Sequence, residues 1–108
     1  MEIDVNDDNF NSEVIERSKQ IPVLVDFWAP WCGPCMILKP ILENISKEMD
    51  KKFILAKVNI EENSECANNY RIMSIPAVKL FKNGKVASEF VGAEPESAIK
   101  NWLEPQLS

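Results

Sequence analysis

Two cysteines, Cys32 and Cys35, stand three residues apart in the segment DFWAPWCGPCMILKP. They lie between an apolar run that is typical of a strand and a periodic run that is typical of a helix. Such a pair can bind a metal, clamp the structure or carry out thiol–disulfide exchange. At a helix start, this spacing places both side chains on one face, about 5–6 Å apart at Cβ, and a disulfide needs about 3.5–4.5 Å. The pair could therefore open and close after a small adjustment, without unfolding the chain.

The start of a helix should make the two thiols differ in how readily they ionise. If Cys32 is the N-cap, it lies beside unpaired N–H groups and the positive end of the helix dipole, which stabilise an anion. We therefore expect Cys32 to ionise readily and to attack disulfides, whereas Cys35, one turn inside and more buried, ionises later. Gly33 leaves the approach to the sulfur uncrowded. Pro34 suits the first helical position, because its missing N–H is not needed there.

Metal binding is the main alternative for the pair. The chain has no histidine and only one further cysteine, Cys66. A structural zinc site usually needs four Cys or His ligands, so one chain cannot complete such a site. Two chains that share a metal cluster remain possible, but the ligand count favours redox chemistry and no metal is expected.

Length and composition predict one domain over residues 1–108, with 45% apolar and 27% charged residues. The net charge of −5 argues against binding to nucleic acid or to an anionic membrane, since both need clustered Lys and Arg. The N-terminus MEIDVNDDNF lacks the basic start and apolar stretch of a signal peptide. Three cysteines do not fit a disulfide-stapled secreted protein. We therefore expect a cytoplasmic protein, or an organellar one whose transit peptide has been removed.

Apolar periodicity predicts the elements that hold the pair in place, in the order β-α-β-α-β-α-β-β-α. We expect Asp7 or Asp8 to cap the first helix, Pro40 to kink the second, and Asn83-Gly84 to form a hairpin turn. Apolar stripes should bury the first helix through residues 10, 14 and 15 and the last through residues 98, 99, 102 and 103. The expected strands are 2–5, 23–28, 53–58, 77–81 and 86–91, and the helices are an N-terminal one, 34–49, 64–70 and one from Pro95.

This pattern gives an α/β protein with a central mixed sheet and helices on both faces. In such sheets, sites lie outside the carboxyl ends of the strands. Cys32 and Cys35 follow the strand 23–28, so the sequence places them at that position.

The segment Trp31–Cys35, preceded by Val25–Ala29, closely resembles the thioredoxin family. The resemblance extends over nearly the whole chain and includes Lys57, Ile75-Pro76 and Val91-Gly92. It implies the thioredoxin fold, a central mixed five-stranded sheet flanked by four helices. It also implies a general protein-disulfide reductase that carries electrons from a thioredoxin reductase to disulfide-containing protein substrates through a reversible Cys32–Cys35 disulfide, and so serves electron transport and cell redox homeostasis. We expect it to act as a monomer, without a cofactor of its own.

The resemblance also assigns a proton acceptor and donor for Cys35, namely Asp26, with Lys57 nearby to modulate its charge. From the residues alone, Asp26 could equally be an end-of-strand carboxylate turned to solvent or a buried one with a raised pKa. A buried Asp26 could exchange protons near neutral pH.

Family members hold a cis proline beside the cysteines, which here is Pro76. The backbone of Ile75 would then face the site and pair with an extended substrate as an added strand. The resemblance further implies a mostly flat apolar docking surface around Cys32, made by Trp31, Ile60, Ile75, Gly92 and Ala93. Ile60 could instead be a core residue at the end of a strand.

Three rival functions remain open at this point. A disulfide oxidase or isomerase would need a less reducing pair and an oxidising compartment. A protein-docking scaffold would not need the intact pair or Asp26. A metal-bridged dimer would share the cysteines of two chains. Cys66 is interpreted as a packed thiol, with a regulatory role such as glutathione capping or dimerisation as the alternative.

Overall fold

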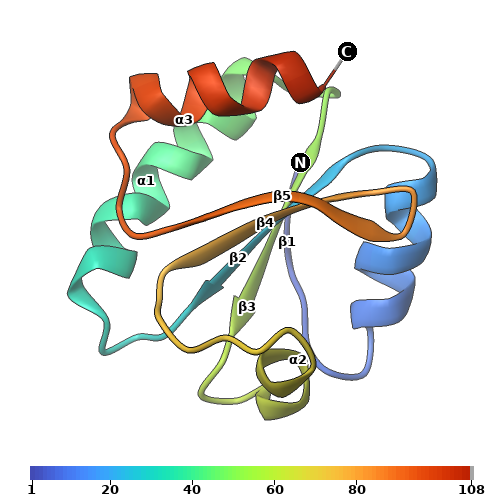
Figure 1. Cartoon of the computed structure of the whole chain (residues 1–108), viewed down its shortest axis with the longest axis vertical. Helices are drawn as coiled ribbons and strands as arrows, with labels where there is room; N and C mark the ends of the chain where they lie inside the picture. Colours follow the sequence, from blue (N-terminus) through green and yellow to red (C-terminus); the bar gives the residue numbers. More distant parts are fainter. Residues whose placement is uncertain (108) are drawn as a thin grey trace.

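A computed structural model describes residues 1–107, in which one five-stranded sheet has the order β1-β3-β2-β4-β5 (Figure 1). The strands β1, β3 and β2 run parallel, and β4 and β5 run antiparallel to their neighbours. The predicted mixed sheet is therefore confirmed, with every strand end within one residue of that expected. The strands are β1 (Glu2–Asp4), β2 (Val23–Trp28), β3 (Ile54–Asn59), β4 (Ala77–Lys82) and β5 (Lys85–Val91).

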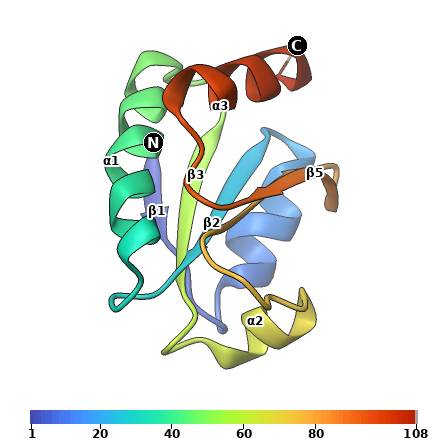
Figure 2. The ribbon, with the colours of Figure 1, turned by 60° about the vertical axis from the view of Figure 1, so that its left-hand side comes forward.

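Helices cover both faces of this sheet (Figures 1 and 2). One face carries α1 and α3, and the other carries α2 and the N-terminal helical segment η1–η2. The four helices predicted from the sequence are thus present, and a short 3-10 turn η3 follows α3. Their bounds are η1 (Asn11–Glu16), η2 (Arg17–Lys19), α1 (Gly33–Glu48), α2 (Ser64–Asn69), α3 (Glu96–Leu103) and η3 (Glu104–Gln106).

Side chains of β2 alternate between the two layers, because successive residues of a strand point to opposite faces. Leu24 packs with Leu38 and Leu42 of α1, whereas Val25 and Phe27 pack on the other face. Asp26 lies two residues after Leu24 in β2, so the two side chains point to the same face of the sheet. The strand therefore directs Asp26 toward the layer that contains α1, the helix that begins beside the cysteines.

The β4–β5 hairpin turns at Asn83-Gly84, as the sequence predicts. Both residues have positive φ, 54° and 82°, which is the backbone that a two-residue hairpin loop requires. The turn joins Lys82 to its partner Lys85 across the hairpin.

The predicted N-cap of the first helix is wrong. Neither Asp7 nor Asp8 caps it; the N-cap is Phe10, without a side-chain hydrogen bond. Asp7 instead accepts hydrogen bonds from the backbone N–H groups of Glu65 (3.3 Å) and Cys66 (2.8 Å) at the start of α2. The carboxylate thus satisfies N–H groups at the start of α2 that have no partner within their own helix.

The stripe expected on the last helix needs a similar correction. Ile99 and Leu103 are buried, as predicted, and Trp102 is partly buried, but Ala98 is exposed. Pro40 lies inside α1 and the helix continues beyond it, as expected. A kink at Pro40 stays a prediction. Among residues 1–107, no helix combines the length and apolar character needed to cross a membrane.

Candidate active site

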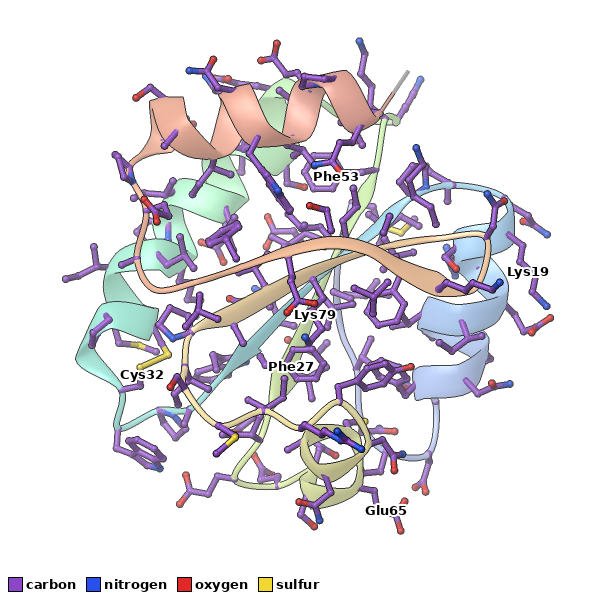
Figure 3. The ribbon with its side chains drawn as sticks, viewed as in Figure 1. Lys19, Phe27, Cys32, Phe53, Glu65 and Lys79 are labelled. Carbon is purple, nitrogen blue, oxygen red and sulfur yellow. A yellow bond between two sulfur atoms is a disulfide. The ribbon has the colours of Figure 1, made fainter. Side chains whose placement is uncertain are left out.

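The cysteine pair lies at the start of α1 (Figure 3). Cys32 is the N-cap residue with extended backbone, and its Sγ accepts a hydrogen bond from the backbone N–H of Cys35 at 3.2 Å. Cys35 is the third helical residue, and the two Cα atoms are 5.2 Å apart. The two sulfurs form a disulfide. The helix start thus places a sulfur where a capping oxygen usually lies.

Both cysteines are buried, and the two residues differ only slightly in exposure. Cys32 is 6% exposed and Cys35 is 1% exposed, so Cys32 is the outer residue of the pair. Ala29 lies between them and the end of β2, and three larger side chains pack around this group. Those three are Trp28, Ile60 and Ile75.

Asp26 is a buried carboxylate, 2% exposed, so the solvent-facing alternative is wrong. Its Oδ1 atom has no hydrogen-bond partner within residues 1–107. Burial raises the pKa of Asp26 to about 7; the positive charge of Lys57 opposes the rise and the negative charge of Glu43 adds to it. Because this value lies near neutrality, Asp26 can take up or release a proton under ordinary conditions.

Lys57 is the neighbour of Asp26 in the β2–β3 register, as the resemblance implies. Its ammonium nevertheless pairs elsewhere: Nζ lies 3.0 Å from Oε2 of Glu43 and 3.3 Å from Oε1 of Glu2. Burial disfavours the charge of Lys57, but the hydrogen bonds to Glu43 and Glu2 outweigh this and raise its pKa.

Sequence reasoning missed both glutamates. A signal for one of them was present, because Cys35, Lys39 and Glu43 recur every four residues and so share one side of α1. Glu2 gave no such signal, since its contact depends on the pairing of β1 with β3.

The Ile75–Pro76 peptide bond is cis. The carbonyl oxygen of Ile75 lies 3.8 Å from Cys32 Sγ, so this backbone borders the disulfide. The backbone N–H of Gly92 donates to the carbonyl of Pro76 at 2.9 Å. Gly92 has a φ of 99°, which favours glycine. These contacts bring the segments around residues 76 and 92 together beside the cysteines.

The residues expected to form the docking surface differ in exposure. Trp31 is 68% exposed and Ala93 is also exposed, whereas Ile60, Ile75 and Gly92 are partly buried. Ile60 packs both against the core on the α2 face and against the cysteine group. The docking role of these residues stays a prediction.

A metal centre finds no further support in the described part of the chain. Residues 1–107 contain no group of three or more Cys, His, Asp or Glu side chains that could hold a metal ion. Cys66 lies in α2, on the opposite face of the sheet from α1, and its thiol is free and buried.

Comparison with known proteins adds independent findings. A family model described as Thioredoxin matches residues 2–105. The chain is 45% identical over 107 residues to a protein of Rickettsia bellii named Thioredoxin, covering 99% of this chain and 100% of that protein. It is 43% identical over 103 residues to the Thioredoxin of Rickettsia felis, covering 95% and 96%. It is 44% identical over 104 residues to a chloroplastic Thioredoxin M-type of Chlamydomonas reinhardtii, covering 96% of this chain and 73% of that protein.

Proposed function

The chain belongs to the thioredoxin family and is a protein-disulfide reductase, and we propose that its activity depends on the unequal positions of Cys32 and Cys35. The observation that carries this proposal is that Cys32 caps α1 with its own sulfur, while Cys35 lies buried one turn inside. The helix N-terminus favours the thiolate form of Cys32, which makes it the nucleophile.

The reaction proceeds through two exchanges. In the first, the Cys32 thiolate attacks one sulfur of a substrate disulfide, the substrate S–S bond breaks, and one substrate thiolate leaves. A mixed disulfide now joins Cys32 to the substrate. In the second, Cys35 loses its proton and attacks Cys32 Sγ, the mixed disulfide breaks, and the second substrate thiolate leaves. Two electrons have passed to the substrate, and the Cys32–Cys35 disulfide remains.

Asp26 is the proposed acceptor of the Cys35 proton. Two observations support this role: β2 directs Asp26 toward the layer of α1, and its carboxylate is buried with one oxygen unpartnered. A pKa of about 7 matches an acid–base group that works near neutrality. Lys57, its neighbour in the sheet register, modulates this charge. Gly33 and Pro34 set the geometry of the motif, with open space beside Gly33.

Substrate is proposed to dock beside Cys32 on Trp31, Ile60, Ile75, Gly92 and Ala93. The backbone of Ile75 borders the sulfur and is available to pair with an extended substrate segment. The exposed indole of Trp31, the residue that precedes Cys32, offers a large apolar surface.

The partners follow from the family in general terms: a reductase that restores the dithiol, and proteins with accessible disulfides. More specifically, we propose a thioredoxin reductase as electron donor, a single domain over residues 1–108, a monomer, and a cytoplasmic location, with an organelle as the alternative. The continuous sheet and the family match over residues 2–105 support the single domain.

Reduction of a model protein disulfide tests the mechanism, with Cys32→Ser, Cys35→Ser and Cys66→Ser compared with the parent protein. We expect the first two variants to lose turnover and the third to keep it. Cys35→Ser should also accumulate a mixed disulfide with the substrate through Cys32, visible by mass spectrometry. Turnover by Cys32→Ser would show that the roles of the two cysteines are assigned wrongly.

A further inference from the structure

The ammonium of Lys57 is held between two carboxylates from different elements. Glu43 approaches it from α1 at 3.0 Å, and Glu2 approaches from β1 at 3.3 Å. The Lys57 side chain is only 14% exposed, and those of Glu2 and Glu43 are 28% and 29% exposed. Ion pairs with this degree of burial are less screened by solvent than surface pairs.

This group, which we call the Glu2–Lys57–Glu43 clamp, lies next to Asp26. Residues 26 and 57 are direct partners in the parallel β2–β3 register, and residue 4 of β1 is the partner of residue 57 on the other side. On β4 the partner of Asp26 is Val78, which carries no charge. The charges that act on Asp26 are those of Lys57 in the sheet and of Glu43 and Lys39 on α1. Glu2 and Asp4 of β1 lie beside Lys57, on its other side, and Cys35 shares the side of α1 that carries Lys39 and Glu43.

In the clamp, Glu2 and Glu43 compensate the positive charge of Lys57. Asp26 Oδ1 has no hydrogen-bond partner in the described residues, while the neighbouring ammonium pairs with two other carboxylates. Without them, the two carboxylates that flank Lys57 in the register would be Asp4, which is exposed to solvent, and Asp26, which is buried away from the water that would compensate its charge. An ion pair would then hold Asp26 in its charged form and prevent it from carrying a proton near neutral pH.

We propose that Glu2 and Glu43 are positioning residues for the second exchange, because they hold the Lys57 ammonium away from Asp26 and keep that carboxyl able to exchange a proton with Cys35. The inference rests on the proposed proton-transfer role of Asp26. Each glutamate contacts Lys57 and acts through it.

The titration of the Asp26 carboxyl in the oxidised protein, followed by carbon NMR, tests the clamp directly. Glu43→Gln and the double variant Glu2→Gln/Glu43→Gln should lower the titration midpoint, the double variant by about one pH unit or more. Glu48→Gln is the matched control, because Glu48 is also an α1 carboxylate paired with a lysine, Lys100, and should leave the midpoint unchanged. An unchanged midpoint in the double variant would overturn the proposal.

A double-mutant cycle separates the clamp from the plain repulsion between Glu43 and Asp26. In a Lys57→Met background, Glu43→Gln can act only through its own charge, so its effect on the Asp26 midpoint should fall to less than half. An equal effect in both backgrounds would show that Glu43 acts directly, and the clamp would be rejected.

The pH profile of the second exchange distinguishes failure of the clamp from failure of the proposed function. We expect the profile of the double Gln variant to move toward acid pH together with the Asp26 midpoint. If the clamp variants leave both unchanged while Asp26→Asn slows the second exchange, the clamp is wrong and the role of Asp26 stands. If Asp26→Asn leaves the second exchange unaffected, the proton-transfer role fails and the inference fails with it.

Discussion

Cysteine occurs at two helix starts in this protein, on opposite faces of the sheet. The two starts differ in whether the sulfur accepts the free N–H groups of the helix. At α1, Cys32 is itself the cap and its sulfur accepts the hydrogen bond of the Cys35 N–H. At α2, the cap is supplied by Asp7 from a distant segment, which accepts the N–H groups of Glu65 and Cys66. Figure 3 shows Cys32 and Glu65 at the two separate helix starts.

As a consequence, the negative charge at the start of α2 lies on a carboxylate and not on the cysteine. The N–H groups at α2 hold the Asp7 carboxylate; its hydrogen bonds with Cys66 and Glu65 lower its pKa despite partial desolvation. Cys66 remains a neutral thiol, because burial, together with the hydrogen bond and negative charge of Asp7, raises its pKa to about 12. We therefore expect the helix N-terminus to activate Cys32, whose sulfur itself occupies the anion position, and not Cys66.

The largest expected difference between the two helix starts is in the rate of thiol alkylation. In the reduced protein at pH 7.5, Cys32 should react rapidly with iodoacetamide. Cys66 should react at least about 1,000-fold more slowly than an ordinary cysteine, since a pKa of about 12 leaves almost no thiolate. Mass spectrometry of peptides over a time course measures both rates.

Unfolding provides the control for that measurement. In denaturant, Cys66 should react at the rate of an ordinary thiol, because burial and the contact with Asp7 are lost. Similar rates for Cys32 and Cys66 in the folded protein would contradict the contrast between the two helix starts.

Asp26 and Asp7 extend the comparison to stability, because their pKa values move in opposite directions. The pKa of Asp26 is about 7 when folded, above its value of 3.8 when exposed, so its contribution is fully present below about pH 4 and is lost as the pH rises through 7. Asp26→Asn should therefore gain stability relative to the parent with rising pH, by up to about 4 kcal/mol. Denaturant unfolding of the oxidised proteins at several pH values between 4 and 9 measures this gain.

The exposed Asp8 is the control for that series, since Asp8→Asn removes the same charge from the surface. Its stability difference from the parent should stay nearly constant with pH. If the stability difference of Asp26→Asn is equally independent of pH, desolvation does not destabilise the ionised carboxylate. The assignment of Asp26 as an acid–base group then loses its physical basis.

Much of the fold could be predicted from the sequence because its signals are local. The apolar run of β2, the periodicity of α1 and the Asn83-Gly84 turn each indicate an element without reference to the rest of the chain. Cys32 as the N-cap of α1 was predictable for the same reason.

What the sequence could not indicate depends on contacts between distant segments. Asp7 or Asp8 was expected to cap the first helix, but Asp7 accepts the N–H groups at the start of α2, 58 and 59 residues away in sequence. Glu2 reaches Lys57 only because β1 pairs with β3. Burial of Asp26 was undecided until α1 was placed over that face of the sheet. The resemblance supplied Asp26 and Lys57, but it did not indicate the two glutamates that hold Lys57.

The smallest expected effect concerns the cap of α2. Asp7→Ala removes the acceptor for two N–H groups and should lower the free energy of unfolding by about 1 kcal/mol at pH 7. Because the pKa of Asp7 is lowered by folding, its stabilisation is present above its unfolded pKa and is lost as the pH falls through its folded pKa. The deficit of Asp7→Ala should therefore shrink below about pH 4, the reverse of the trend at Asp26.

Asp7→Asn sharpens this last test, because it keeps an acceptor oxygen and removes only the charge. We expect it to retain most of the stability, and to raise the alkylation rate of Cys66, because the negative charge of Asp7 contributes to the raised pKa of that thiol. Asp8→Ala, which changes an exposed neighbour, should alter neither quantity. If Asp7→Ala is as stable as Asp8→Ala and Cys66 stays equally unreactive in both, burial alone governs that thiol, and the carboxylate at the start of α2 has no part in the contrast with α1.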